Sequence, residues 1–386
     1  MINIDFLYFD AGGGHRASAT ALKLVCEQQQ RPWTVRLVNL QEVLDSIDVF
    51  RKWTGRRMQD WYNLLLRSGW TLGSAELLPL MHWIIRRFGE QVVREMALHW
   101  NRTQPAMVVS LIPNFNRYLR QALSRACPAA PFVVLLTDFA DYPPNFWMEP
   151  QDEYVLCGSE RAVEQAREMG HGEDHIFRTP GMILHPRFYE PFTANRADER
   201  RKLGLDPEKP TGLVLFGGQG AWVMKSIAER LERSGLDLQL ILICGRNERL
   251  AAELRRRAWR IPVFVEGFTH EVPYYMFLSD FFIGKPGPGS VAEALQMKLP
   301  VIVERNAWTL PQERYNTEFV REKQVGLVVR SFRSRELVEA VAELLKPGVL
   351  VQYRRNAAAL ENDAVFMIPD ILSEILARHA SRAAAG

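Results

Sequence analysis

The chain of 386 residues lacks any apolar run close to the roughly 20 residues that a membrane-spanning helix needs. Its first residues include Asp5, where a signal peptide carries basic residues, and the apolar stretch ends within about ten residues. These two absences argue against a spanning helix and against export. We therefore expect any membrane contact to be peripheral.

Cysteine is scarce, with four residues and no CxxC pair. This scarcity argues against a zinc site and against a disulfide framework. Each cysteine falls in an apolar segment, where a buried free thiol is the common outcome, so we expect reduced core residues in a cytoplasmic protein. The four residues are Cys26, Cys127, Cys157 and Cys244.

Excess charge is also nearly absent, since the formal net charge is only +3. A balance this small does not indicate nucleic-acid binding, and we expect no nucleic-acid partner. Hydrophobic residues at 47% and charged residues at 24% are typical of a globular protein. The length suits two domains of about 150 to 200 residues each.

Short apolar runs of strand length alternate with longer helical patterns, which indicates βαβ units and parallel sheets. The pattern restarts after a polar, proline-punctuated stretch at residues 186–210. The predicted fold class is therefore α/β, with two Rossmann-like doubly wound domains. The expected strands are residues 4–9, 35–40, 107–111, 132–137 and 154–157, then 213–216, 238–243, 263–265, 281–283 and 301–303.

These patterns predict a first domain over residues 1–190 and a second over residues 200–362. Residues 363–386 are expected to form a final helix and a frayed tail, with the helix packing back on the first domain. Residues 191–201 lack a strand pattern and form the expected linker. Ligands of such domains lie outside the carboxyl ends of the strands, so the cleft between the two sheets is the expected active site.

A glycine-rich turn follows the first expected strand, with Gly12, Gly13, Gly14 and His15 in succession before a helical pattern over residues 19–27. Glycines allow a ligand to approach closely, and a helix start presents unpaired N–H groups. A histidine here can take a proton from an attacking hydroxyl, because its ordinary pKa is close to neutrality. The alternative, equally weighted from this pattern alone, is a histidine that merely packs or caps.

A second glycine-rich segment, residues 284–295, follows the strand at 281–283 and enters a helix that Ser290 could cap. Its N–H groups and helix dipole would hold a diphosphate, and Glu293 could accept hydrogen bonds from ribose hydroxyls. The alternative is an ordinary glycine–proline turn. Residues 310–316 return to the same sheet edge and offer groups suited to sugar hydroxyls or, as plausibly, a polar helix start: Gln312, Glu313 and Asn316.

Four segments in order, namely residues 12–19, 244–247 and 284–294 and the pair Gln312-Glu313, closely resemble the monogalactosyldiacylglycerol synthases. The resemblance covers nearly the whole chain. Bacterial processive diacylglycerol glycosyltransferases and the lipid II N-acetylglucosaminyltransferase of peptidoglycan synthesis are similar to a lesser degree. It implies a GT-B fold, in which the first domain faces the acceptor and the membrane and the second binds the UDP-sugar.

The resemblance also implies roles for individual residues. His15 would be the catalytic base, and Asp138 would orient it or hold the acceptor hydroxyl, although a strand-end Asp can simply cap the next turn. Glu293 would contact the uridine ribose. The remaining donor-side residues would hold the phosphates, the uracil and the sugar: Gly217, Gly218, Gly267, Phe268, Gly287, Gly289, Ser290, Gln312, Glu313 and Asn316.

Two acceptor-side segments depart from the plant pattern, which has His-Pro pairs at these places. This chain has residues 112–114, Ile-Pro-Asn, at one and residues 141–145, Asp-Tyr-Pro-Pro-Asn, at the other. The departures leave the donor side intact and put the identity of the acceptor in doubt.

Basic and aromatic residues are interleaved between residues 51 and 87, a combination that favours an anionic lipid interface. The apolar tract at residues 77–85 is long enough to insert shallowly but too short to span. The alternative is a pair of amphipathic helices that cover the first sheet. The residues of the expected membrane surface are Arg56, Arg57, Trp61, Trp70, Trp83, Arg86 and Arg87.

The sequence thus predicts inverting transfer of a hexose, with galactose favoured, from a UDP-sugar to the hydroxyl of 1,2-diacylglycerol. We expect no metal or other cofactor, and a location on the inner face of the plasma membrane with anionic lipids as partners. A glucose donor, processive transfer and another lipid acceptor stay open. Outside this class, a UDP-sugar 2-epimerase or a non-catalytic sensor also stays open, and neither explains the basic aromatic region.

Overall fold

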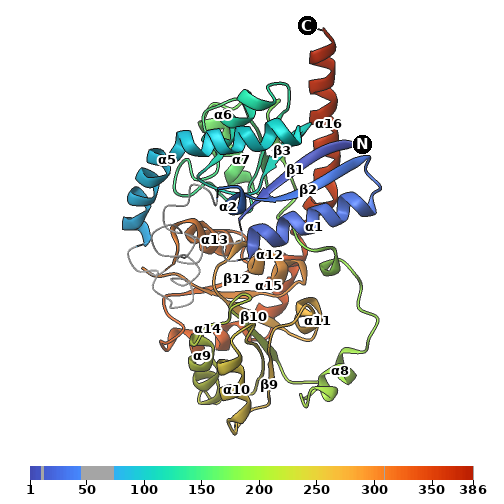
Figure 1. Ribbon diagram of the computed structural model, residues 1–386. Coiled ribbons are helices and arrows are strands. Elements are labelled where there is room, and N and C mark those ends of the chain that lie inside the picture. Colours follow the sequence, from blue (N-terminus) through green and yellow to red (C-terminus); the bar gives the residue numbers. More distant parts are fainter. Residues whose placement is uncertain (10–12, 45–73, 308, 386) are drawn as a thin grey trace. The chain divides into compact units, whose positions relative to one another are not determined.

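The computed structural model describes residues 1–9, 13–44, 74–307 and 309–385, and it divides into two units (Figure 1). The first unit contains residues 1–186, 310–312 and 362–386, and the second contains residues 187–309 and 313–361. Each unit has one six-stranded parallel sheet and its own core. The predicted α/β class with two Rossmann-like domains is confirmed.

The first sheet has the strand order β2-β1-β3-β4-β5-β6, and all of its pairings are parallel. Its central strands are buried on both faces, which is why they read as continuous apolar runs. The strands are β1 (Ile2–Tyr8), β2 (Trp33–Asn39), β3 (Met107–Ser110), β4 (Phe132–Leu135), β5 (Tyr154–Cys157) and β6 (Ile176–Arg178).

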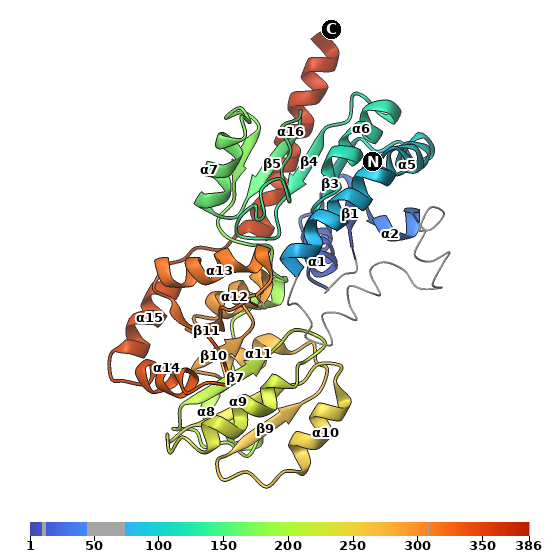
Figure 2. The ribbon, with the colours of Figure 1, turned by 90° about the vertical axis from the view of Figure 1, so that its left-hand side faces the viewer.

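Helices cover both faces of this sheet. The long α5 packs with α6 and α7 over one core cluster, in which Trp100 of α5 is fully buried. The final helix, α16, packs against α1 and belongs to the first unit, and Figures 1 and 2 show it passing beside α1. The helices are α1 (Gly14–Gln28), α2 (Leu40–Val43), α5 (Ser74–Thr103), α6 (Asn116–Ala126), α7 (Glu160–Glu168) and α16 (Ala364–Ala385).

The second sheet has the order β12-β11-β10-β7-β8-β9, again with every pairing parallel. In chain order this is the arrangement 3-2-1-4-5-6 of dinucleotide-binding domains, and its direction reverses between β7 and β10. The strands are β7 (Thr211–Leu215), β8 (Gln239–Ile243), β9 (Val263–Glu266), β10 (Phe281–Gly284), β11 (Val301–Glu304) and β12 (Gly326–Val329).

The helices of the second unit also lie on both faces of its sheet. Helices α9, α10 and α14 share one core cluster, and α12 contacts α15. A single 3-10 turn at Pro186–Phe188 marks the point where the chain leaves the first unit. The helices are α8 (Arg196–Lys202), α9 (Val223–Glu232), α10 (Glu248–Arg256), α11 (Val272–Phe277), α12 (Pro288–Gln296), α13 (Pro311–Glu322), α14 (Glu336–Leu344) and α15 (Val349–Ala358).

Two further predictions concern the cysteines and membrane-spanning helices. All four cysteines are buried and free, as predicted. No helix among the described residues is long and apolar enough to cross a bilayer.

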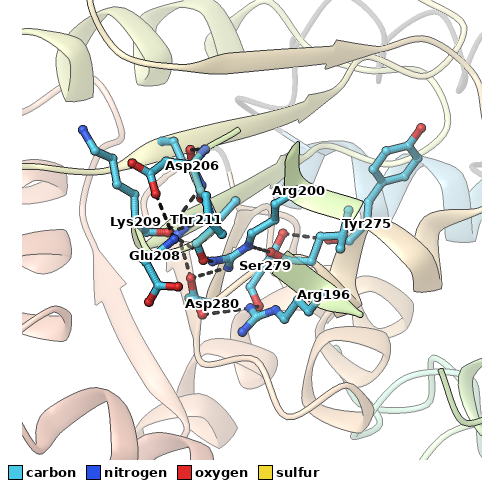
Figure 3. A network of polar contacts seen from close by, with 12 residues as sticks. Arg196, Arg200, Asp206, Glu208, Lys209, Thr211, Tyr275, Ser279 and Asp280 are labelled. Carbon is cyan, nitrogen blue, oxygen red and sulfur yellow. Dashed lines mark hydrogen bonds and ion pairs between the residues drawn. The ribbon is translucent and has the colours of Figure 1, made fainter. Parts of the chain in front are cut away.

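The amino edge of the second sheet is tied together by the buried carboxylate of Asp280 (Figure 3). Its oxygens lie 2.8 Å from Arg196 Nη2, 2.7 Å from Arg200 Nη2 and 3.0 Å from Arg354 Nη2, and they accept the Thr211 N–H. Burial raises the pKa of Asp280, but Arg196 and Arg200 more than offset this and hold it below its ordinary value. The network therefore joins α8 and α15 to the first residues of β7 and β10.

We expect Asp280→Asn to lower the free energy of unfolding by about 3–5 kcal/mol, because it leaves the buried guanidinium of Arg200 without its counter-charge. Urea denaturation measures this. The lowered pKa means that the stabilisation is lost as pH falls through the folded-state value. Glu339→Gln is the matched control, since it removes an exposed pair with Arg335. Equal losses in the two variants would contradict the assignment.

Candidate functional site

The carboxyl edge of the first sheet carries the predicted histidine. Strands β1 and β3 are neighbours at which the strand order reverses, and ligands of such sheets bind outside the carboxyl ends of the strands at this point. Helix α1 begins at Gly14, because Gly13 before it has a φ of 83°, which glycine adopts freely. The expected start at residue 19 is therefore five residues late, and His15 lies in the first turn of α1 rather than at the tip of a loop.

The His15 ring is held by residues that follow two other strands. Its Nδ1 lies 3.1 Å from Thr137 Oγ1, just beyond β4, and which atom donates depends on the ring tautomer. The Trp147 ring lies against it with the ring centroids 5.7 Å apart. Burial lowers the pKa of His15 to about 4, although a hydrogen bond with the backbone of Leu111 opposes the shift. The imidazole is therefore neutral at neutral pH and can accept a proton.

Asp138 lies at the same edge and is almost fully buried. Its Oδ2 accepts a hydrogen bond of 2.9 Å from the indole N–H of Trp147. The carboxylate thus holds the tryptophan whose ring packs against His15, while the neighbouring Thr137 meets the imidazole itself. Sequence reasoning missed Thr137 and Trp147, and the only signal for Thr137 was its place at the end of a strand.

The two acceptor-side loops that depart from the plant pattern are joined to each other. The Asn116 side chain donates to the Trp147 carbonyl at 2.6 Å, and the Asn114 N–H donates to the Phe146 carbonyl at 2.6 Å. Asp141 accepts the N–H of Trp147 at 2.6 Å, and burial raises the pKa of Asp141 to about 6. These bonds fix the loop that carries Trp147 by contacts within the first unit alone.

The carboxyl edge of the second sheet carries the predicted phosphate and uracil segments. The loop after β7 contains Gly217 and Gly218, and it meets the loop after β8 so closely that a Cβ at Gly245 would lie 2.5 Å from the Gly218 carbonyl oxygen. The Arg246 N–H donates to that oxygen at 2.9 Å. The Arg246 guanidinium covers the exposed ring of Phe268 at 4.7 Å, so the predicted phosphate and uracil segments are neighbours.

Helix α12 begins at the same edge, after β10, and no side chain of the described residues caps its first turn. Gly287 is the N-cap, and Pro288 follows because its fixed φ suits the first helical position. The expectation that Ser290 caps the helix is therefore wrong, since Ser290 already lies within the first turn. A Cβ added at Gly289 would meet no described atom within 4 Å, so a side chain would have room at this position of the first turn.

Glu293 lies inside α12, one turn further on, and is half-buried. Burial raises the pKa of Glu293 to about 7, so the carboxyl is easily protonated near neutrality. Such a group can accept or donate a hydrogen bond to a sugar hydroxyl.

The polar residues of α13 have different surroundings. Gln312 is half-buried, whereas Glu313 is nearly buried and lies 3.3 Å from Lys285 Nζ. Asn316 is fully buried, and its Nδ2 donates to the Pro286 carbonyl at 2.7 Å. Asn316 therefore holds the loop before α12 in place, and its predicted contact with the sugar stays a prediction.

Several predicted residues lie outside this description. Gly12 and the membrane residues Arg56, Arg57, Trp61 and Trp70 fall in the ranges that the structure does not describe. The backbone at Trp83 and Arg86 is part of α5, but their side chains are likewise outside the description, and Arg87 is exposed. Gly14 starts α1, and Gly267 follows β9.

Comparisons with known proteins bear on both units. Residues 213–368 match the glycosyltransferase family 28 C-terminal domain. Over 394 aligned residues the chain is 29% identical to a probable monogalactosyldiacylglycerol synthase of Glycine max, covering 96% of this chain and 71% of the relative. It is 28% identical to monogalactosyldiacylglycerol synthase 1 of Arabidopsis thaliana, with 96% and 70% covered. The chain is a glycosyltransferase of the GT-B type and a homologue of these synthases.

Solved structures agree on the fold of this glycosyltransferase. MurG of Acinetobacter baumannii has a TM-score of 0.62 at 14% identity, covering 97% of this chain and all of MurG. Anabaena HepE in complex with UDP-glucose has a TM-score of 0.56 at 14% identity, with 98% and 100% covered. The family 28 domain begins within β7 and ends within α16, so it contains every donor-side loop described above.

We expect the His15 imidazole of this glycosyltransferase to titrate far below the ordinary value of 6.5, because burial disfavours its charged form. Nuclear magnetic resonance of the chain with ¹³C-labelled histidine measures the midpoint. The spectrum of His15→Gln identifies the signal. A midpoint near 6.5 would show that His15 is exposed to water and would contradict its described surroundings.

Proposed function

We propose that this glycosyltransferase transfers a hexose, galactose rather than glucose, from a UDP-sugar to the hydroxyl of 1,2-diacylglycerol. The carrying observation is that similarity to monogalactosyldiacylglycerol synthases extends over 96% of the chain. It therefore includes residues 1–186 of the first unit, which the family 28 domain does not cover. HepE, which shares the fold, binds UDP-glucose, and this supports a UDP-sugar as donor.

The described residues suit an inverting displacement. Neutral His15 accepts the proton of the acceptor hydroxyl while that oxygen forms a bond to the anomeric carbon. The bond from the anomeric carbon to the diphosphate breaks, and its electron pair leaves with UDP. The uncapped start of α12 stabilises the growing negative charge, so the proposed reaction needs no metal ion.

Location is part of the same proposal. A diacylglycerol acceptor remains in a bilayer, so the enzyme has to work at a membrane surface. We assign it to the inner face of the plasma membrane, held by anionic lipids through the basic and aromatic residues between residues 51 and 87.

Transfer is tested with diacylglycerol in anionic vesicles and each UDP-hexose, followed by mass spectrometry of the lipids. We expect a monohexosyl product, formed faster from UDP-galactose and unaffected by EDTA. His15→Ala should lower kcat by about 10²–10⁴-fold, because the general base is lost, while UDP still binds. Release of free hexose epimers instead of a glycolipid would sink the proposal in favour of an epimerase.

The donor site is tested separately with Gly289→Ala. Alanine has room there and suits a helix better than glycine, so we expect stability to be unchanged or to rise by up to about 1 kcal/mol. The added methyl should nonetheless weaken UDP-galactose binding, because it occupies the space in front of the uncapped N–H groups. Calorimetry and thermal unfolding measure the two effects. Unchanged affinity would place the diphosphate elsewhere.

A further inference from the structure

An ion pair lies at the entrance to the loop between β10 and α12. Lys285 Nζ is 3.3 Å from Glu313 Oε1. The lysine side chain is 42% exposed, whereas that of Glu313 is only 10% exposed. A pair open to water on one side contributes about 0–1 kcal/mol to stability, so folding alone gives little reason for a nearly buried carboxylate here.

The pair surrounds the residue that precedes the uncapped helix. A Cβ built on Gly287, the N-cap of α12, would lie 3.4 Å from Lys285 Cε and 3.6 Å from Glu313 Oε1. The Lys285 side chain therefore lies beside Gly287, the residue after which the free N–H groups of α12 begin. The bond from Asn316 to the Pro286 carbonyl fixes the backbone between Lys285 and Gly287.

The pair and the helix start both contribute charge at this point of the loop. The helix start carries about half a positive charge, the ammonium adds a full one, and Glu313 neutralises the ammonium. A diphosphate carries at least two negative charges, and the helix start alone compensates for a small part of them. Lys285 has a flexible four-carbon stem and is half-exposed, so its ammonium can leave Glu313 without any backbone movement.

We propose that Lys285 is the cation that binds the β-phosphate of the donor, and that Glu313 holds this ammonium only while the site is empty. When the donor binds, the ammonium moves to the β-phosphate, and the freed carboxylate of Glu313 accepts hydrogen bonds from the hexose. This inference deepens the proposed function and rests on it for the identity of the donor.

The role of Lys285 in the reaction is electrostatic. As the bond between the anomeric carbon and the diphosphate oxygen breaks, the electron pair stays on that oxygen and the charge of the β-phosphate rises. The proton of the acceptor goes to His15, and the new bond joins the acceptor oxygen to the anomeric carbon. Lys285 keeps all of its protons and acts where the charge grows, so its removal should lower kcat as well as donor affinity.

The test measures calorimetric binding of UDP, UMP and uridine to the full chain and to two variants. Lys285→Met should weaken UDP binding by at least about tenfold, UMP binding by less than about threefold and uridine binding not at all. Glu313→Gln should leave UDP binding as tight as in the unmodified chain or tighter, because it frees the ammonium. The signature is a loss of UDP affinity in Lys285→Met without a loss in Glu313→Gln, since a merely structural pair would give both variants the same effect.

Lys209→Met is the matched control. It removes a comparable pair with Asp237 before the amino ends of β7 and β8, at the opposite edge of the same sheet, and should leave all three affinities unchanged. Equal weakening of UDP and UMP by Lys285→Met, or equal losses in Lys285→Met and Glu313→Gln, would overturn the assignment. UDP binding does not depend on the acceptor, so a chain that shows these affinities without lipid glycosylation would refute the proposed acceptor and keep the role of Lys285.

Discussion

Every strand in both sheets runs parallel to its neighbours, and the rest of the structure depends on this constraint. Each connection must return the chain to the amino edge, so the loops at the carboxyl edge are left to serve function. In the second unit, the stabilising network and the proposed ligand-binding loops lie at opposite edges of the sheet. The Asp280 network joins helices and strands at the amino edge, and the glycine loops and the uncapped α12 lie at the carboxyl edge.

Close packing of glycine loops explains how the second unit offers backbone to an anion. The loops after β7 and β8 meet at Gly218 and Gly245 with no room for a side chain at Gly245. At Gly289, by contrast, a side chain would meet no described atom, so neither packing nor φ requires glycine there. A glycine that the fold does not require is best explained by a ligand that must come close to the helix start.

The sequence was sufficient to predict ten of the strands, because central strands of parallel sheets are continuous apolar runs. It missed β6 and β12, because their residues are only partly buried and carry no continuous apolar run of strand length bounded by turn residues. The start of α1 was predicted too late, because its first turn is exposed and shows no helical periodicity. The positive φ of Gly13 marks the residue before which the helix cannot continue. The contact of His15 with Thr137 spans 122 positions, and no local pattern encodes it.

A catalytic base must be unprotonated before the reaction and must bind a proton strongly during it, and the surroundings of His15 affect these two properties in opposite ways. Burial keeps the imidazole neutral and ready to accept a proton, but the same lowered pKa makes it a weak base. A weak base is adequate in the proposed displacement, because the acceptor hydroxyl becomes more acidic as its oxygen forms the bond to the anomeric carbon. In the proposal His15 therefore takes the proton in the same step in which UDP departs. The larger demand in the proposed reaction therefore falls on stabilising the leaving diphosphate, the task that we assign to the start of α12 and to Lys285.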